Sequence, residues 1–330
     1  MKIIIPLAGK GTRLRPHTHS KPKPLLHVAG KPLLQHIIDV CKTVEFSEMI
    51  FITGHLKDSI ESFVKENYDF PCKFVEQKSM DGTAGALRLA EPYMTEDVLI
   101  VYADTMFDTD LSIIDKIRND ENIDGVMWAQ EVEDYQRFGV MVVDKDNIMT
   151  KIVEKPKDPV SKLANIGMYY IKNNKLLVEG IEHVYKENIK LGSEYFLTDA
   201  FSYMISKGSR LLVTKVDAWY DCGTFDTLLE TNALLLKRFN ESHSKLVNSV
   251  VIAPSFIGKN VILENSVIGP NVSIADGTTV KNSVIKNSII DEKAVVTASV
   301  LQDSTIGQCA KVKGNFKKLH VGDSSDISSD

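Results

Sequence analysis

A run of regularly spaced aliphatic residues near the end of the chain most limits what this sequence can fold into. From Val247 to Val312, small and polar residues are interrupted by an isoleucine or valine at every fifth or sixth position. Such a hexapeptide repeat folds as a parallel β-helix, in which each hexad forms one face of a triangular coil and about 18 residues complete a turn, giving about three to four turns here. The residues that we expect to point inward are Ile252, Ile257, Ile262, Ile268, Ile274, Val280, Ile285, Ile290, Val295, Val300, Ile306 and Val312.

Upstream of the repeat, apolar runs alternate with helical patterns. Strands that alternate with helices favour a mostly parallel sheet covered on both faces, and after Asp110 further strands with little helix between them indicate an antiparallel addition to that sheet. We therefore expect residues 1–241 to form one α/β domain with a Rossmann-like mixed sheet. Residues 242–314 then form the β-helix, and residues 315–330 form a polar, frayed tail.

The segment that follows the first apolar run carries the clearest sign of a binding site. Gly9 and Gly11 free backbone N–H groups to approach an anion, and α/β folds bind nucleotides where a strand leads into such a loop before a helix. Seven lysines and arginines and no acidic residue occur up to Ile38, although the whole chain has a formal charge of −5. This favours a small polyanionic ligand over nucleic acid. The glycines alone fit a solvated turn equally well, and both the Walker and the dinucleotide patterns are incomplete here.

The longer segment resembles the signature of the sugar-1-phosphate nucleotidyltransferases, also called nucleotide-sugar pyrophosphorylases. It reads Gly-x-Gly-Thr-Arg-Leu-x-Pro-x-Thr-x-x-x-Pro-Lys-Pro from Gly9 to Pro24. The resemblance implies that an NTP and a sugar 1-phosphate react to give a nucleotide-sugar and pyrophosphate, with Mg²⁺ as cofactor and a left-handed β-helix as a frequent appendage. It also implies that Arg13 and Lys23 contact the triphosphate. The other nucleotide-binding residues that it implies at this loop are Leu7, Ala8, Gly9, Gly11 and Thr12.

Two aspartates qualify as ligands of a Mg²⁺ ion, which prefers hard oxygen donors. Asp104 follows an apolar strand, at the carboxyl end where open α/β sheets bind ligands, and Asp221 lies between an expected strand and a helix. Both resemble the metal-binding aspartates of the family. Asp108 and Asp110 are close enough in sequence to confuse the first assignment, although Asp110 is also typical of a helix N-cap.

Base recognition is expected at Gln77 and Gly82. A glutamine side chain offers one donor and one acceptor, so it can pair with the O4 and N3–H edge of uracil or thymine, and the Gly82 N–H can add a backbone contact. The spacing is similar to that of the thymidylyl- and uridylyltransferases, which favours UTP or dTTP. Guanylyltransferases share the Gly-Thr-Ala-Gly that begins at Gly82, and Asp-Gly is a common turn, so mannose-1-phosphate guanylyl transfer remains open.

The second substrate, with glucose 1-phosphate favoured, is expected to bind at residues spread over the middle of the chain. The Glu-Lys-Pro at Glu154 resembles the family motif in which Lys155 neutralises the sugar phosphate, so Lys155 joins Arg13 and Lys23 as a catalytic candidate. The residues expected to bind the sugar phosphate are Gly139, Glu154, Lys155, Asn165, Gly167 and Glu194.

Composition narrows the remaining classes. Four scattered cysteines fit a reducing cytoplasm, and no apolar stretch has the length of a membrane span, so we expect a soluble cytoplasmic protein with no nucleic-acid or membrane partner. A non-catalytic, sugar-nucleotide-binding regulatory homologue is the first alternative. Acyl transfer is the second, but such β-helices commonly use a histidine base and none occurs between Leu246 and Gly314. We expect the β-helix to serve homo-oligomerisation or stability.

Overall fold

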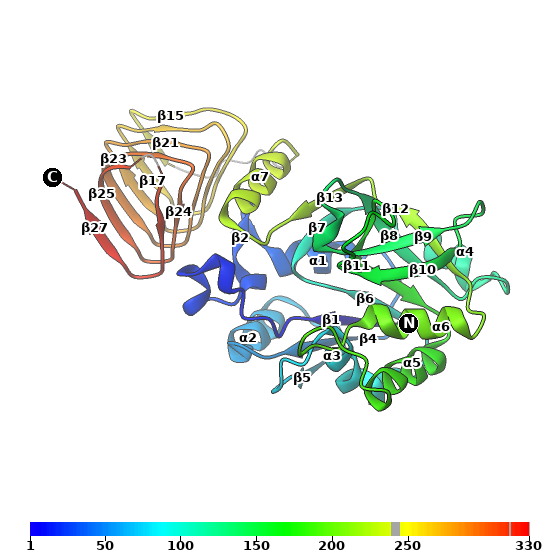
Figure 1. Ribbon diagram of the computed structural model, residues 1–330. Coiled ribbons are helices and arrows are strands. Elements are labelled where there is room, and N and C mark those ends of the chain that lie inside the picture. The colour runs from blue at the N-terminus through cyan, green and yellow to red at the C-terminus, as the bar shows by residue number, and fades with distance from the viewer. Residues whose placement is uncertain (239–244, 317, 330) are drawn as a thin grey trace. The chain divides into compact units, whose positions relative to one another are not determined.

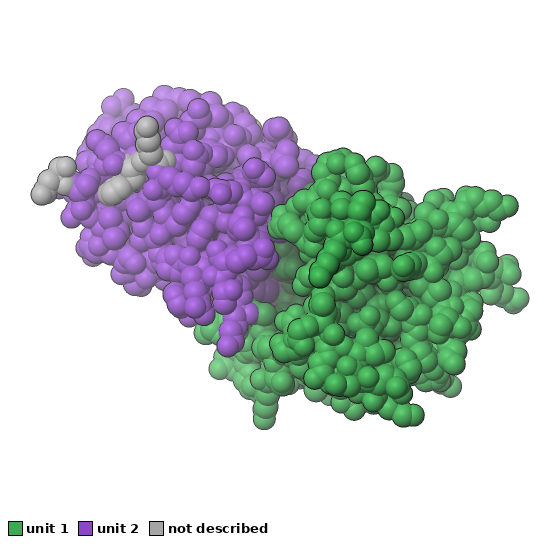
Figure 2. Space-filling view, viewed as in Figure 1, with its two compact units in different colours: residues 1–9, 37–219 green, residues 10–36, 220–330 purple. Residues whose placement is uncertain are grey.

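The computed structural model describes residues 1–238, 245–316 and 318–329 (Figure 1). Within these ranges the chain forms two compact units. The first unit comprises residues 1–9 and 37–219, and the second comprises residues 10–36 and 220–330 (Figure 2). The signature segment after Gly9 therefore groups with the β-helix, whereas we expected it to group with the sheet. The expected domain boundary between residues 241 and 242 lies outside the described residues.

A mixed sheet forms the centre of the first unit. Its parallel half has the order β6, β1, β4, β5, and its other half joins through β11, which is antiparallel to β6, β8 and β9. The expected change from parallel to antiparallel pairing is thus confirmed. The strands of this sheet are β1 (Lys2–Pro6), β4 (Glu48–Thr53), β5 (Cys72–Glu76), β6 (Val98–Val101), β8 (Gly125–Glu131), β9 (Gly139–Val143), β10 (Met149–Glu154), β11 (Leu163–Ile171) and β12 (Leu211–Lys215).

Continuous aliphatic runs place the central strands between helices. Ile3, Ile4 and Ile5 of β1 have no exposed surface, as expected for a strand covered on both faces. Asn173 starts one covering helix, because its side-chain oxygen accepts the Leu176 N–H at 3.1 Å. The helices are α1 (Leu33–Cys41), α2 (Lys57–Asn67), α3 (Thr83–Ala90), α4 (Ile113–Arg118), α5 (Asn174–Lys186), α6 (Leu197–Ser206) and α7 (Phe225–Leu236), of which α7 belongs to the second unit.

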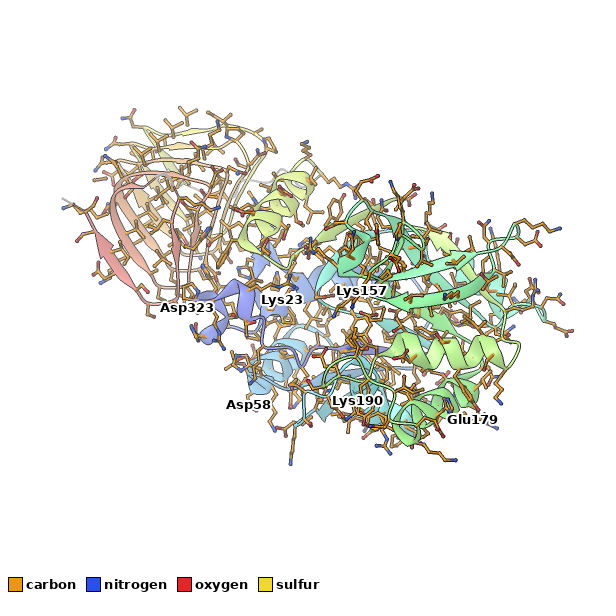
Figure 3. The ribbon with its side chains drawn as sticks, viewed as in Figure 1. Lys23, Asp58, Lys157, Glu179, Lys190 and Asp323 are labelled. Carbon is orange, nitrogen blue, oxygen red and sulfur yellow. The ribbon has the colours of Figure 1, made fainter. Side chains whose placement is uncertain are left out.

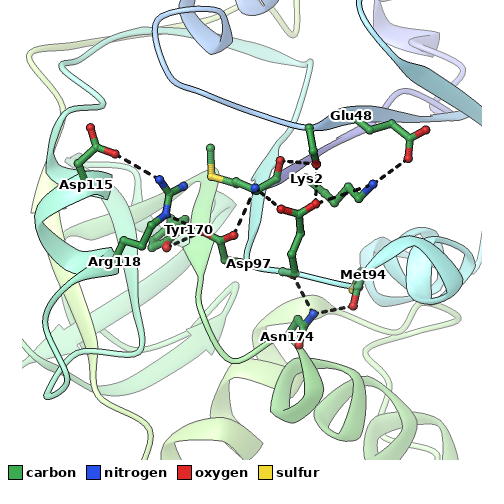
Figure 4. Close-up of polar contacts among 11 residues, drawn as sticks. Lys2, Glu48, Met94, Asp97, Asp115, Arg118, Tyr170 and Asn174 are labelled. Carbon is green, nitrogen blue, oxygen red and sulfur yellow. Dashed lines mark hydrogen bonds and ion pairs between the residues drawn. The ribbon is translucent and has the colours of Figure 1, made fainter.

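A polar network closes the edge of the sheet at which β1 begins (Figure 4). The Met1 ammonium contacts Glu96 and lies 3.4 Å from Asp97, which also accepts from Tyr170 Oη at 2.8 Å and pairs with Arg118 Nε at 3.1 Å. Burial alone would raise the pKa of Asp97, but these three donors hold it below its usual range. Because this network occupies the edge where β1 begins, the carboxyl ends of the parallel strands are left for ligands.

The β-helix of the second unit has the expected triangular coils. In one wall, five parallel strands stack five inward aliphatic residues, and the coils shorten along the stack from 17 residues to 15, below the expected 18. The stacked residues are Ile257, Ile274, Ile290, Ile306 and Val321. With the mixed sheet of the first unit, this confirms the expected fold class.

Four of the twelve expected inward residues were wrong. Ile252, Ile262 and Val300 are 42%, 48% and 50% exposed, and Val295 is half-buried. The next residue fills the core in three of these hexads, where Leu263, Val296 and Leu301 are buried, and the preceding Val251 packs against the core in the fourth. Successive side chains of a strand point to opposite faces of the sheet. Where two adjacent residues are both aliphatic, the spacing therefore does not tell which of them points into the core.

The β-helix also continues past Gly314. Two strands, β26 and β27, lie in the segment that we expected to be a frayed tail, because Val321 and Ile327 continue the inward stacks. The strands of the second unit are β2 (His27–Val28), β3 (Lys31–Pro32), β14 (Lys245–Val247), β15 (Val250–Val251), β16 (Ser255–Ile257), β17 (Ile262–Glu264), β18 (Val267–Ile268), β19 (Val272–Ile274), β20 (Thr279–Lys281), β21 (Val284–Lys286), β22 (Ser288–Ile290), β23 (Val295–Gln302), β24 (Thr305–Ile306), β25 (Lys311–Phe316), β26 (His320–Val321) and β27 (Asp326–Ser328).

Asn232 of α7 joins the signature segment to the β-helix within the second unit. This fully buried side chain accepts the Ala29 N–H at 2.9 Å and the Ser273 hydroxyl at 2.6 Å, and it donates to the Asn271 carbonyl at 3.3 Å. A buried amide with both of its ends bonded fixes one relative placement of the segments that it joins. Among the described residues, no helix is long and apolar enough to cross a membrane.

Candidate active site

A cavity of about 200 Å³ opens in the first unit, among the strands of the sheet. It brings together five of the residues proposed from the sequence, although these come from widely separated segments. They are Asp104, Gly139, Glu154, Asn165 and Gly167. Aromatic residues form much of the remaining lining, namely Tyr102, Phe138, Tyr169, Phe196 and Trp219. A small cavity with aromatic walls and a few polar groups suits one sugar-sized ligand.

Two polar groups of opposite hydrogen-bonding character border Gly139. The Asn165 Oδ1 accepts the Gly167 N–H at 2.9 Å and the Tyr169 hydroxyl at 2.7 Å, which fixes the amide orientation and turns Nδ2 away from these donors. A Cβ atom at Gly139 would lie 3.6 Å from this Nδ2 and 2.9 Å from Glu154 Oε2. A ligand against the Gly139 backbone therefore meets one donor and one carboxyl group, which suits a hydroxyl.

Glu154 also contacts Thr198, whose hydroxyl donates to Oε2 at 3.3 Å. Burial raises the pKa of the Glu154 carboxyl, Lys155 and Thr198 oppose the rise, and Asp199 and Glu194 add to it. At a pH below that raised pKa, the protonated carboxyl group can also donate its O–H in a hydrogen bond. Glu194 is exposed and is not among the residues that line the cavity.

Lys155 has a strained backbone directly beside the cavity. Its φ of +44° is rare for a residue with a side chain, and its N–H bonds to the Phe138 carbonyl at 3.0 Å. Its Nζ lies 4.8 Å from the centre of the Phe196 ring, and Phe196 lines the cavity. The Lys155 side chain is 45% exposed and pairs only loosely with Glu154, at 3.9 Å. An ammonium in this position can reach an anion at the rim of the cavity.

The base-binding candidates lie at the carboxyl ends of neighbouring parallel strands. Gln77, which follows β5, is 6% exposed, and its N–H bonds to the carbonyl of Thr53 at the end of β4. Leu7 and Ala8, which follow β1, are also buried, and the Leu7 N–H bonds to the Ile52 carbonyl at 2.7 Å. These residues therefore share one edge of the sheet, as the resemblance implies for base and ribose binding.

The Gln77 side-chain amide has a defined orientation. Its Nε2 donates to Asp81 Oδ1 at 3.3 Å and to the Gly82 carbonyl at 3.4 Å. A carboxylate and a carbonyl only accept, so the NH₂ group must face them and Oε1 must face the other way. The Tyr185 hydroxyl holds Asp81 at 2.5 Å, and Gly82 has a φ of +106° where a side chain would overlap the Tyr195 carbonyl. The amide orientation thus depends on a rigid neighbourhood.

In the second unit, the signature segment folds back on itself around Gly11. This residue has a φ of +59°, and its carbonyl accepts the Thr18 hydroxyl at 2.8 Å. A Cβ atom at Gly11 would lie 3.1 Å from Lys23 Cβ and 3.1 Å from Thr18 Cγ2, so the glycine lets the turn of Lys23 lie against the start of the loop. Thr12 and Arg13, in the short 3₁₀ turn Thr12–Leu14, are exposed, and Lys23 is half-buried.

Arg13 and Asp221 meet at Gly223 in the same unit. A Cβ atom at Gly223 would lie 2.9 Å from Asp221 Oδ1 and 3.0 Å from Arg13 Nη2. The Gly223 N–H also donates to Asp221 Oδ1 at 2.8 Å, which orients the carboxylate between β13 (Ala218–Asp221) and the start of α7. Arg13 and Asp221 thus bring together a cation and a carboxylate, the side-chain types that bind a phosphate and its metal ion.

The donor set fits Mg²⁺ in chemical character. Asp104, in the first unit, is exposed and lines the cavity, and Asp221, in the second unit, accepts the Gly223 N–H at Oδ1. Among the described residues, no group of three or more histidine, cysteine or acidic side chains could hold a metal ion. Mg²⁺ usually takes one or two carboxylates and completes its shell with phosphate oxygens and water, so each aspartate is a suitable ligand by its chemistry. Asp110 instead accepts the Ser112 N–H at 2.8 Å before α4.

The sequence reasoning missed several residues that shape these sites. Asp81 lies between the expected residues Gln77 and Gly82, and Thr198 lies four residues after Glu194, but only their contacts with the distant Tyr185 and Glu154 show how they are placed. The aromatic lining had no sequence signal, since its members come from separate segments of the chain. Lys21, which belongs to the basic signature, pairs with Asp291 of the β-helix at 2.5 Å.

The mixed sheet and the parallel β-helix define a two-part α/β protein with a ligand cavity in its sheet-bearing unit. Residues 2–238 match the family model described as nucleotidyl transferase, and the chain belongs to that family. The signature pattern in the sequence indicated this family, and the match confirms it.

Two curated relatives illustrate the match. The chain is 35% identical over 254 residues to bifunctional protein GlmU of Methanocaldococcus jannaschii, covering 76% of this chain and 59% of that protein. It is 28% identical over 222 residues to UTP–glucose-1-phosphate uridylyltransferase AglF of Haloferax volcanii, covering 66% and 89%. The chain therefore spans about three fifths of the length of the bifunctional relatives that it matches.

Solved structures show the same fold. The crystal structure of a UDP-glucose pyrophosphorylase complexed with UDP-glucose matches with a TM-score of 0.62 and 25% identity, over 72% of this chain and 98% of that one. A putative glucose-1-phosphate thymidylyltransferase from Bacillus anthracis matches with the same TM-score and 26% identity, over 74% and 98%.

Proposed function

We propose that the protein transfers a nucleotidyl group from UTP or dTTP to glucose 1-phosphate, in the presence of Mg²⁺. A phosphate oxygen of the sugar phosphate attacks the α-phosphorus of the NTP, the bond from that phosphorus to the α,β-bridging oxygen breaks, and pyrophosphate leaves with the electron pair. The attacking oxygen is already ionised, so the reaction needs charge neutralisation and alignment more than a general base.

This chemistry assigns a role to each cation. Arg13 and Lys23 neutralise the triphosphate, and Lys155 neutralises the sugar phosphate. Asp104 and Asp221 are proposed to hold the Mg²⁺, which supplies further charge neutralisation for the triphosphate. The cavity of the first unit carries this proposal for the sugar, because Glu154 and Asn165 offer an acceptor and a donor beside the Gly139 backbone.

The orientation of Gln77 supports the choice of base. With its NH₂ group engaged by Asp81 and Gly82, the free Oε1 accepts a hydrogen bond and cannot donate one. Uracil and thymine present an N3–H donor, whereas cytosine presents an acceptor at N3 and adenine an acceptor at N1. Guanine also presents a donor, at N1, so it can make the same hydrogen bond to Gln77 Oε1. The guanylyl alternative therefore differs from the proposal in the size of the base and not in this contact.

A substrate matrix tests the proposed function. Pyrophosphate release is measured for UTP, dTTP, CTP, ATP and GTP against the 1-phosphates of glucose, galactose, mannose and N-acetylglucosamine. We expect the largest kcat/KM with UTP or dTTP and glucose 1-phosphate. A preference for GTP with mannose 1-phosphate would replace the proposal with the guanylyl alternative. No turnover with any pair, together with retained nucleotide-sugar binding, would indicate the regulatory homologue.

The Asp81→Asn variant tests base selection directly. Asparagine can turn its own NH₂ group toward Gln77, which removes one of the two acceptors that fix the Gln77 amide and makes its reversal, and with it a hydrogen bond to cytosine N3, less costly. We expect the ratio of kcat/KM for UTP over CTP to fall about tenfold, the size of one hydrogen bond of about 1.4 kcal/mol. The exposed Asp58 of α2, labelled in Figure 3, gives the matched control Asp58→Asn. An unchanged UTP-to-CTP ratio in Asp81→Asn would contradict the proposed orientation.

The β-helix contains one histidine after all, but the contacts of this side chain do not support acyl transfer. The β-helix extends further than expected, so it contains His320, which the sequence argument had placed outside it. The His320 ring stacks on Phe225 with centres 4.2 Å apart, and its Nδ1 lies 2.8 Å from Thr305 Oγ1. Burial and the nearby Lys318 and His17 lower its pKa to about 4. These contacts describe a packed side chain rather than a base beside a substrate.

We also propose that the protein is a homo-oligomer. A column of valines, registered strand to strand, faces outward on one wall of the β-helix: Val250, Val267, Val284 and Val300. Three of them are 56%, 45% and 50% exposed. An exposed aliphatic column of this kind favours association with a second copy. Light scattering of the full-length chain should give a multiple of 36.8 kDa, whereas a monomeric mass would refute the proposal.

A further inference from the structure

One corner of the β-helix carries a carboxylate where the other stacked coils have a glycine or an alanine. In the stacked wall, the residue that follows each inward aliphatic residue occupies the same corner of successive coils. Four of these five corner residues are glycine or alanine, and the fifth is an aspartate. In chain order they are Gly258, Ala275, Asp291, Gly307 and Gly322. A Cβ atom at Gly307 would lie 2.6 Å from the Asp323 backbone nitrogen, so this corner has little room for a side chain.

The aspartate is buried against the signature segment. Asp291 is 4% exposed, its Oδ2 lies 2.5 Å from Lys21 Nζ, and its Oδ1 lies 3.0 Å from His27 Nδ1. Burial alone would raise the pKa of this carboxyl, but His27 and Lys21 hold it well below its usual range, so the group is a carboxylate at neutral pH. A buried carboxylate is costly to leave without the lysine ammonium and the imidazole that lie against it.

Asp291 Oδ1 also accepts the N–H of the next residue, Glu292, at 2.8 Å. Its partners in the signature region, Lys21 and His27, flank the turn that carries Lys23. This 3₁₀ turn, Lys23–Leu25, begins two residues after Lys21 and ends two residues before His27. Fixing both flanks to one carboxylate therefore restricts the backbone from which Lys23 extends. Because Gly11 lies against Lys23 Cβ, the same restriction reaches the start of the loop.

The rest of the segment is also tied to the β-helix, through two further coils. His17 Nε2 lies 3.0 Å from Thr305 Oγ1, and the Ser20 hydroxyl bonds to Asp323 at 2.6 Å. Figure 3 labels Lys23, which lies on the signature segment, and Asp323, the β-helix residue that accepts the Ser20 hydroxyl. The β-helix thus provides the surface on which the signature segment folds, and Asp291 is its charged contact with the flanks of Lys23.

We propose that Asp291 is a positioning residue for NTP binding, which acts by holding Lys21 and His27 and thereby the Lys23 turn. This inference rests on the proposed role of Lys23 at the triphosphate. It makes the β-helix a working part of nucleotide binding, beyond any role in assembly. If the contacts of Asp291 served only stability, their loss would instead raise KM for both substrates equally and would lower the stability of the whole protein.

The test compares the full-length Asp291→Asn and Asp276→Asn variants with the wild type. Asparagine keeps the shape of the side chain and removes its charge, and Asp276 is an exposed β-helix carboxylate that bonds to the Lys259 N–H. For Asp291→Asn we expect KM for UTP to rise about tenfold, which corresponds to about 1.4 kcal/mol, while KM for glucose 1-phosphate stays within about twofold. Hydrogen exchange in residues 17–27 should become faster. Asp276→Asn should match the wild type in all three.

A double variant gives a second, independent measurement. If Lys21 acts through Asp291, then Lys21→Gln combined with Asp291→Asn should raise KM for UTP no further than Asp291→Asn alone. Unchanged KM for UTP in an active Asp291→Asn variant would overturn the inference, as would equal losses for both substrates that follow a lowered Tm. A wild type that is inactive throughout the substrate matrix would instead overturn the proposed function. In that case hydrogen exchange still tests whether Asp291 holds the segment.

Discussion

We expect the Asp104→Asn and Asp221→Asn variants each to lose Mg²⁺-dependent turnover by about a thousandfold or more, with the fold retained. Asparagine preserves the volume of the side chain but replaces one charged metal ligand by a neutral amide, which costs several kcal/mol of charge stabilisation. In Asp221→Asn, the Gly223 N–H that now bonds to Oδ1 also competes for the one remaining oxygen. The measurement is initial-rate kinetics over a range of Mg²⁺ concentrations, with Tm as the check on folding.

Two neighbouring carboxylates serve as controls for the metal ligands. Asp110 accepts the Ser112 N–H in the segment after Asp104, and Asp217 is an exposed residue just before β13. Asp110→Asn and Asp217→Asn should keep turnover within about threefold of the wild type, because neither removes a ligand. Full activity in Asp104→Asn or in Asp221→Asn would remove that residue from the proposed metal site. Titration of MgUTP by calorimetry then distinguishes weaker nucleotide binding from a slower chemical step.

The second large effect is expected at Lys155. The Lys155→Ala variant should lower kcat/KM for glucose 1-phosphate by about 10- to 100-fold, the worth of one charged hydrogen bond to phosphate, while the affinity for UTP stays within about threefold. Its backbone φ of +44° aims this side chain, so the loss should be specific to the anion at the cavity rim. Steady-state kinetics with each substrate varied in turn makes the comparison.

Lys157 provides the matched control for this prediction. It is an exposed lysine two residues further along the same loop, labelled in Figure 3, and Lys157→Ala should leave both kinetic constants near the wild-type values. A comparable loss of affinity for both substrates in Lys155→Ala would count against its assigned role. The same conclusion would follow if Lys157→Ala reproduced the effect.

Local patterns in the sequence predicted most of the secondary structure and the family. The aliphatic runs of β1 and β6 and the hexapeptide spacing each depend on neighbours within a few residues, so they can be read without the fold. The same reasoning failed where two adjacent residues were equally apolar, as at Ile262 and Leu263, because strand register decides which one is buried.

The parts of the site that could not be predicted depend on pairs far apart in the chain. Lys21 and Asp291 are separated by 270 residues, and Asp81 and Tyr185 by 104. No periodicity links such pairs, and a lysine in a basic motif looks the same whether it contacts a phosphate or a carboxylate. The sequence could therefore name Gln77 and Lys23 but could not show what holds them.

The grouping of residues 10–36 with the β-helix bears on how this chain could be recombined with its relatives. A crossover placed after α7 would join a foreign β-helix to the native signature segment and would separate Lys21 and His27 from Asp291. An exchange that preserves these pairs must transfer two pieces of sequence that are far apart along the chain. The unit that must be exchanged as a whole is therefore discontinuous in the sequence. Relatives that have different β-helices are expected to differ also in the segment between Gly9 and Ile37.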